Sequence, residues 1–187
     1  MKASKFNGWF GELVTDCKIC KSQHFNSRPE TQISLIVIHN ISLPPEKFGG
    51  DDIEHFFQGN LDFNKHPFYQ EIKHLTVSSH FLIKRSGEIV QFVSTNDRAW
   101  HAGKSVFLGE NECNDFSIGI ELEGCDNQLF CKEQYQTLAN LTLLIMQQYP
   151  AITPQRIIGH SDIAPARKTD PGPHFDWRLF YLLLEQK

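Results

Sequence analysis

The feature that most constrains the fold is a compact apolar run, ISLIVI at residues 33–38, followed at once by His39 and Asn40. A run of this length, rich in β-branched residues, is typical of a buried central strand. The sequence ISLPP at residues 41–45 ends the strand because it contains two prolines. His39 therefore stands where strand gives way to loop, a favoured position for functional residues on α/β sheets.

Further strands are expected along the chain. Residues 76–83 and 88–93 alternate or are β-branched, and the turn sequence KRSG between them predicts an antiparallel hairpin. Residues 116–123 alternate as well, which places Glu121 and Glu123 on the same face of one strand. Helices are expected over residues 49–59, over residues 132–149 and over residues 176–184, the last of them capped by Asp176.

These elements predict one α/β domain around a mixed sheet, spanning residues 33–187. At 187 residues the chain has the length of a single ordinary domain and needs no disulfide or metal to fold. Residues 1–32 are polar and interrupted, and are expected to form an irregular arm that packs on the domain through Phe6, Trp9 and Phe10. Residues 61–75 show no clear period, which is typical of a long binding loop.

Composition excludes several classes of partner. The net charge of −4 and the pI near 6.1 argue against a nucleic-acid-binding surface, since such surfaces are usually basic. The sequence has no apolar run approaching the roughly 18 residues of a membrane span. Its first residues, MKASKFNGWFGELV, lack the apolar core of a secretory signal, so a cytoplasmic location is expected.

The five cysteines are consistent with that location, because an odd number cannot all pair within one chain and thiols persist in a reducing compartment. Cys17 and Cys20 form a CxxC motif. A zinc knuckle needs a second pair of cysteines, and a redox motif needs a strand followed by a helix. Neither context is visible, so we interpret this motif as a chance match.

The stretch IIGHSDIAPARKTDPGP at residues 157–173 concentrates chemically active side chains, namely His160, Asp162, Arg167, Lys168 and Asp170. Three prolines and two glycines interrupt it, which predicts an irregular, partly rigid loop rather than a helix or strand. Two imidazoles and a carboxylate, from His39, His160 and Asp170, are a ligand set that suits zinc and leaves a fourth position for water. Spacing alone does not distinguish this site from histidines with structural roles.

Five motifs resemble one enzyme family: IVIHNISLPPEKFGG, VSSHFLIKRSGEIVQFV, RAWHAG, CNDFSIGIELEG and IIGHSDIAPARKTDPGP. In this order they are similar to type 2 N-acetylmuramoyl-L-alanine amidases, and within them to AmpD-type 1,6-anhydro-N-acetylmuramyl-L-alanine amidases of bacterial cell-wall recycling. The resemblance covers residues 33–180. It implies the fold shared with peptidoglycan-recognition proteins, a mixed central sheet flanked by helices, and one catalytic Zn²⁺.

The resemblance also implies roles for individual residues. The zinc ligands of the family correspond to His39, His160 and Asp170. Its catalytic glutamate corresponds to Glu121, which takes the proton of the attacking water and passes one to the leaving amine. Its cation corresponds to Lys168, which faces the developing oxyanion.

Four further residues are candidates near this site. Glu123 is an alternative to Glu121 as the general base. By position Asn40, Trp100 and His101 line the cleft and contact sugar or stem peptide, although Trp100 can equally belong to the core.

The function implied is hydrolysis of the amide between the lactyl group of anhydro-N-acetylmuramic acid and L-alanine in cytoplasmic peptidoglycan recycling. The substrate is a small muropeptide, and no nucleic acid, membrane or obligate protein partner is implied. One alternative is a muropeptide-binding module that has lost catalysis, but such modules usually lack a third metal ligand, which here is Asp170. A second alternative is a secreted or phage-type amidase that attacks intact cell wall.

Overall fold

The computed structural model describes residues 6–14 and 16–186 and is built around a six-stranded mixed sheet with the strand order β1-β5-β4-β9-β3-β10. The strands of this sheet are β1 (Lys18–Ile19), β3 (Leu35–Ile41), β4 (Phe81–Ile83), β5 (Ile89–Gln91), β9 (Ser117–Glu123) and β10 (Ile157–Gly159). Two small antiparallel sheets lie outside it, formed by β2 (Phe25–Ser27) with β6 (Asp97–Ala99) and by β7 (Val106–Phe107) with β8 (Glu110–Asn111).

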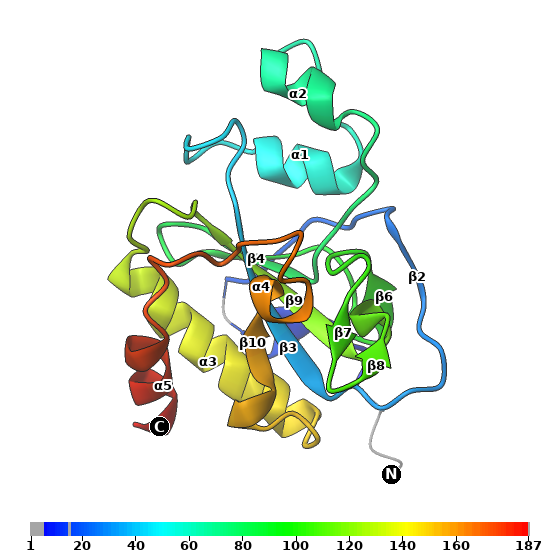
Figure 1. Cartoon of the computed structure of the whole chain (residues 1–187), viewed down its shortest axis with the longest axis vertical. Coiled ribbons are helices and arrows are strands. Elements are labelled where there is room, and N and C mark those ends of the chain that lie inside the picture. The colour runs from blue at the N-terminus through cyan, green and yellow to red at the C-terminus, as the bar shows by residue number, and fades with distance from the viewer. Residues whose placement is uncertain (1–5, 15, 187) are drawn as a thin grey trace.

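The helices lie around this sheet. They are α1 (Asp52–Gln58), α2 (Pro67–Ile72), α3 (Lys132–Gln148), α4 (His160–Ile163) and α5 (Trp177–Glu185), with 3₁₀ turns η1 (Phe10–Glu12), η2 (Cys113–Asp115) and η3 (Pro154–Arg156). Helices α3 and α5 lie side by side, whereas α1 and α2 project together beyond one end of the sheet (Figure 1). The predicted α/β domain with a mixed sheet flanked by helices is confirmed.

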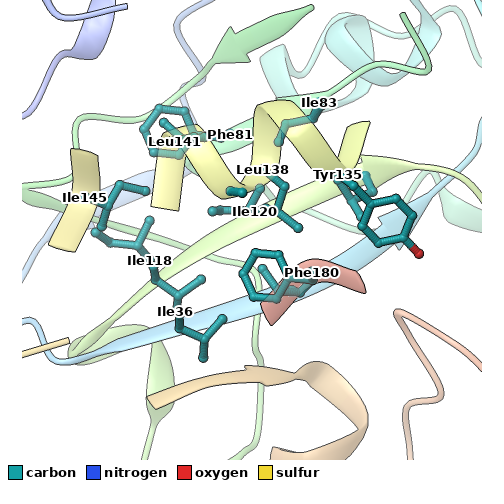
Figure 2. Close-up of a cluster of buried hydrophobic side chains, with 14 of the residues drawn as sticks. Ile36, Phe81, Ile83, Ile118, Ile120, Tyr135, Leu138, Leu141, Ile145 and Phe180 are labelled. Atoms are coloured by element: carbon teal, nitrogen blue, oxygen red, sulfur yellow. The ribbon is translucent and has the colours of Figure 1, made fainter. Parts of the chain in front are cut away.

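The apolar run that opened the analysis is β3, and it is buried on both faces. Ile36 and Ile38 belong to the main core beneath α3 and α5, whereas Leu35 and Val37 point into a smaller apolar cluster on the opposite face. Figure 2 shows the main core, where residues of β3, β4 and β9 meet the helices. The labelled side chains are Ile36, Phe81, Ile83, Ile118 and Ile120 from the sheet, Tyr135, Leu138, Leu141 and Ile145 from α3, and Phe180 from α5.

Parallel pairing brings the candidate site residues together. Strands β4, β9, β3 and β10 are parallel to one another, so their carboxyl ends lie along one edge of the sheet. Within this edge His39 is paired with Glu121, and Gly159 is paired with Ile38. His160, which follows Gly159, therefore emerges beside His39.

The predicted hairpin is confirmed, because β4 and β5 pair antiparallel around the turn at residues 84–87. Two other predictions were wrong. The supposed loop at residues 61–75 contains helix α2, which begins with Pro67 and is capped by His66 through a bond from the Phe68 amide to Nδ1 at 3.2 Å. The stretch after Ile157 was expected to contain no helix, yet α4 begins at His160 itself.

The residues before position 33 contribute to both the sheet and the core. Strand β1 pairs with β5, and Phe10 is fully buried with its ring 5.4 Å from that of Phe81. Arg28 donates to four backbone carbonyls, with distances of 3.2 Å to Thr95, 2.7 Å to Asn114, 3.0 Å to Asp115 and 2.6 Å to Ser117. This guanidinium therefore joins the N-terminal segment to the start of β9.

Glu54 in α1 is the centre of a partly buried ion cluster. Its side chain is 3% exposed and accepts from Lys18 Nζ at 2.6 Å and also binds Lys84. Burial alone would raise the pKa of Glu54, but the two lysines lower it below its usual value. Because the pKa is lower in the folded chain, this contribution to stability is complete above the unfolded-state pKa and is lost as the pH falls through the folded-state pKa.

We therefore expect Glu54→Gln to lower the free energy of unfolding at neutral pH by about 3 kcal/mol, and the difference from the unmodified protein to shrink below a pH of about 4. Urea unfolding at both pH values measures this change. The control is Glu71→Gln, since Glu71 is exposed on α2 and its loss should change nothing. An equal loss of stability in Glu54→Gln at both pH values would contradict the prediction.

Candidate active site

A cavity of about 370 Å³ opens at the edge where the parallel strands end. One wall is polar and is formed by His39, Asn40, Ser78, His101, Glu121, His160, Lys168 and Asp170. The rest of the lining forms a mostly apolar wall. It comes from Trp100, which follows β6, and from α1, α2 and their flanking loops, which contribute Leu43, Pro45, Phe56, Phe57, Phe68, Ile72, Leu75 and Val77. The cavity thus joins a cluster of reactive side chains to a hydrophobic surface.

Three potential metal ligands converge in the polar wall. The Nδ1 atoms of His39 and His160 are 3.0 Å apart, and Asp170 Oδ2 lies 2.9 Å from the first and 3.0 Å from the second. Donor atoms around a tetrahedral zinc ion, at bond lengths of about 2.0–2.1 Å, are separated by about 3.3 Å. The three atoms would therefore need to move apart only slightly to coordinate such an ion.

The protonation of the ligands also fits a cation. His160 Nε2 lies 3.0 Å from the carbonyl oxygen of Ala102, which only accepts, so Nε2 is the donor, and in the neutral imidazole Nδ1 then presents a lone pair. Burial lowers the pKa of His39 to about 4, which keeps this imidazole neutral. Burial opposes ionisation of Asp170, but contacts with the two histidines hold its pKa well below the usual value. Lone pairs and a negative charge thus face one another at short range, an arrangement that a metal ion stabilises.

Glu121 faces the same cavity from β9. Its side chain is 8% exposed, and Oε2 is buried without a hydrogen-bond partner among the described residues. Burial, together with the charge of Asp170, raises the pKa of Glu121 well above its usual value, while Lys168 opposes the shift. Glu123, the alternative base, does share the face of Glu121, but its two oxygens accept from the backbone amides of Gly49 at 2.5 Å and Arg85 at 3.0 Å.

The other predicted site residues also line the cavity. Lys168 does so without an ion pair to any described residue. The Asn40 amide donates to Asp126 Oδ1 at 2.7 Å and to the Pro171 carbonyl at 3.0 Å. Trp100 is half-buried and donates through Nε1 to Asn26 Oδ1 at 2.7 Å. The ring of His101 forms part of the wall, and both of its nitrogens are hydrogen-bonded within the protein.

Sequence reasoning missed two parts of this site. The carbonyl of Ala102 orients His160, but a backbone oxygen leaves no signal in the sequence. The apolar wall includes Phe56 and Phe57 of α1 and Phe68 and Ile72 of α2. The phenylalanines were visible in the sequence, but nothing indicated that they line the same cavity as the metal ligands.

Among the residues that the structure describes, no other group of three side chains could bind a metal ion. A hollow of about 440 Å³ between α3 and the turn at residues 86–88 is lined by neither histidine nor cation. The CxxC pair of Cys17 and Cys20 belongs to no cluster of three metal-binding side chains in the described ranges. In the same ranges, every helix is too short or too polar to cross a membrane.

The chain is similar to known proteins in both sequence and fold. Residues 29–173 match the family of N-acetylmuramoyl-L-alanine amidases. The chain is 56% identical over 169 residues to the 1,6-anhydro-N-acetylmuramyl-L-alanine amidase AmpD of Haemophilus influenzae, covering 90% of this chain and 92% of that protein. A crystal structure of a selenomethionine AmpD derivative superposes with a TM-score of 0.91 at 49% identity, covering 97% of this chain and 99% of that one.

A more distant structure was solved with a ligand. It is the N-acetylmuramyl-L-alanine amidase AmiD from E. coli in complex with anhydro-N-acetylmuramic acid-L-Ala-D-γ-Glu-L-Lys, with a TM-score of 0.61 at 30% identity, covering 84% of this chain and 60% of that one. The resemblance predicted from the five sequence motifs is confirmed. The chain therefore belongs to the N-acetylmuramoyl-L-alanine amidase family of hydrolases, and it matches AmpD proteins over nearly its whole length.

Proposed function

We propose that this protein uses one zinc ion to hydrolyse the amide between 1,6-anhydro-N-acetylmuramic acid and L-alanine, in the cytoplasmic recycling of muropeptides. The observation that carries the proposal is the convergence of His39, His160 and Asp170 beside Glu121 in the wall of an open cavity. The relatives named AmpD support the choice of the anhydro substrate, as does the anhydro-muropeptide bound to AmiD.

The donor set of two imidazole nitrogens and one carboxylate oxygen suits zinc, and a catalytic site of three protein ligands leaves a position for substrate or water. When bound, zinc supplies Lewis acidity, which lowers the pKa of a water molecule toward about 7 and polarises a carbonyl group. Two observations support this role: His160 Nε2 donates to the Ala102 carbonyl, which leaves Nδ1 to face the ion, and burial favours the neutral form of His39.

Glu121 is the proposed general base and then general acid. Its carboxylate takes a proton from the attacking water as the new C–O bond forms, and gives a proton to the L-alanine nitrogen as the C–N bond breaks. Its unpartnered oxygen supports this role, because a carboxylate committed to structural bonds, such as Glu123, is not available to exchange protons.

Lys168 is the proposed cation for the oxyanion that develops on the lactyl carbonyl, an interaction worth about 3–4 kcal/mol in comparable sites. Its position in the wall without an ion-pair partner among the described residues supports this role. We propose further that Asn40, Trp100 and His101 contact the sugar or stem peptide. The apolar wall from α1 and α2 is suited to the less polar, bridged face of an anhydro sugar.

The test is to incubate the purified protein with anhydro-muramyl-tripeptide and, separately, with the corresponding non-anhydro muropeptide, and to follow free peptide by mass spectrometry. We expect release from the anhydro form only, loss of release after chelation, and recovery on addition of zinc. Release from both substrates would indicate a general cell-wall amidase. Zinc binding without release from either would indicate a non-catalytic binding module and would refute the proposal.

A further inference from the structure

The imidazole of His101 is held between a metal ligand and a buried serine. Its Nδ1 lies 3.0 Å from His39 Nε2, and its Nε2 lies 3.3 Å from Ser117 Oγ. Ser117 Oγ is in turn 2.5 Å from the carbonyl oxygen of Cys113. A continuous line of four groups thus runs from the ligand His39 to a backbone carbonyl.

The donor and acceptor of each hydrogen bond in this line can be assigned by starting from the carbonyl oxygen of Cys113. A carbonyl oxygen has no proton to give, so the Ser117 hydroxyl must donate to Cys113. Having used its proton, Ser117 Oγ accepts from Nε2–H of His101. A neutral imidazole protonated at Nε2 has a lone pair at Nδ1, and this lone pair accepts from Nε2–H of His39.

These hydrogen bonds also determine the state of Nδ1, the other ring nitrogen of His39. Because the His39 proton is fixed on Nε2, its Nδ1 presents a lone pair toward His160 Nδ1 and Asp170 Oδ2. The second histidine ligand reaches the same state by a shorter route, since His160 donates directly to the carbonyl of Ala102. One dipeptide, His101-Ala102, therefore orients both histidines.

Two neighbouring residues, Asn114 and Gly119, fix the position of this dipeptide. The side-chain oxygen of Asn114, which is 4% exposed, accepts from the amides of His101 at 3.2 Å and Ala102 at 2.8 Å. On β9, a Cβ at Gly119 would lie 2.5 Å from Cγ of His101. The imidazole therefore occupies the space of the missing side chain, which explains a glycine in the middle of a fully buried strand.

We propose that His101, through Ser117, is a positioning residue that fixes the tautomer and orientation of His39 for metal binding. This inference rests on the zinc site of the proposed function. Partners of this kind, which hydrogen-bond to a metal-bound histidine, commonly contribute 10- to 100-fold to metal affinity. This positioning role of His101 is separate from the substrate contact proposed above. It predicts that loss of His101 changes zinc affinity even when no substrate is present.

The test measures zinc affinity by competition with a chromophoric chelator in substrate-free protein. We expect His101→Phe, which keeps a ring but removes the acceptor, to weaken zinc binding about 10- to 100-fold. His101→Asn should recover most of the affinity, because its side-chain oxygen can accept from His39. Ser117→Ala should weaken binding several-fold, and adding it to His101→Phe should cause little further loss because both act along one path.

The matched control is Ser94→Ala. Ser94 is also buried, donates to the Asn7 carbonyl at 3.0 Å and accepts from the Asn96 amide at 3.2 Å, but it lies outside the line. Its loss should leave zinc affinity unchanged. Thermal unfolding of each zinc-free variant identifies those that fold, and Ser117→Ala, which removes a single oxygen, decides the question if His101→Phe does not fold.

Three results would overturn the inference: unchanged zinc affinity in His101→Phe or in Ser117→Ala, equal losses in His101→Asn and His101→Phe, or fully additive losses in the double variant. If the unmodified protein binds zinc and these results appear, only the role of His101 fails. If the unmodified protein binds no zinc at all, the proposed function fails as well, and the two failures are thereby separated.

Discussion

Substitution of Glu121 by glutamine is expected to slow hydrolysis of the anhydro-muropeptide by about 10²- to 10⁴-fold, the usual contribution of a positioned general acid–base. Glutamine has nearly the same shape and leaves the side chain in the cavity wall, where it is 8% exposed. It cannot take the proton of water, so kcat should fall while KM and zinc affinity stay close to those of the unmodified protein. Steady-state kinetics and zinc titration together measure this separation.

The control for this prediction is Glu123→Gln, two residues along the same face. Its carboxylate accepts from two backbone amides, and an amide group can satisfy only one of them. We therefore expect a loss of about 1–3 kcal/mol in the free energy of unfolding and little change in kcat. If the kinetic loss appeared in Glu123→Gln and not in Glu121→Gln, the assignment of the base would be wrong.

Substitution of Asp170 by asparagine is expected to abolish both turnover and the stabilisation that zinc gives to the fold. A ligand present at 1,000 times its Kd stabilises the native state by about 4 kcal/mol. For a domain of this size that corresponds to an increase of roughly 8–16 °C in Tm. Because the neutral amide removes the only negative charge from the ligand set, the Tm of Asp170→Asn should not respond to zinc.

Asp162 provides the matched control within the same segment. Its Oδ2 accepts from the Gly159 amide at 2.7 Å at the start of α4 and does not take part in the ligand cluster. Asp162→Asn should lower the stability of the protein slightly and retain the response of Tm to zinc. A zinc response that survives in Asp170→Asn, measured by differential scanning calorimetry with and without chelator, would remove Asp170 from the proposed site.

Sequence reasoning was accurate where a periodic pattern is long or a turn signal is strong. The run before His39 and the alternation through Glu121 predicted β3 and β9, and their pairing explains why residues far apart in the sequence meet. It failed for α2 and α4, which span only six and four residues and are too short to show a helical period. Their N-terminal ends are stabilised by local hydrogen bonds to the side chains of His66 and Asp162, which pattern analysis does not resolve.

Tertiary contacts determine the parts that no local pattern reveals. Strand β1 has two residues and exists because β5 offers it a partner. Ser117 is an ordinary strand residue in the sequence, and only the fold shows that its hydroxyl lies beneath His101. The tautomer of His39 is likewise a property of its neighbours, so it follows from the assembled site and not from the sequence motif that contains the histidine.

The position of Arg28 has a practical consequence for the smallest autonomous folding unit. The span shared with the family begins at residue 29, directly after the guanidinium that donates to four carbonyls. A protein trimmed to that span would lose these bonds, the buried ring of Phe10, and strand β1. It would also expose the edge of β5, and an unpaired strand edge promotes aggregation. The span that matches the amidase family as a whole and the span that we expect to fold cooperatively therefore begin at different places in this chain.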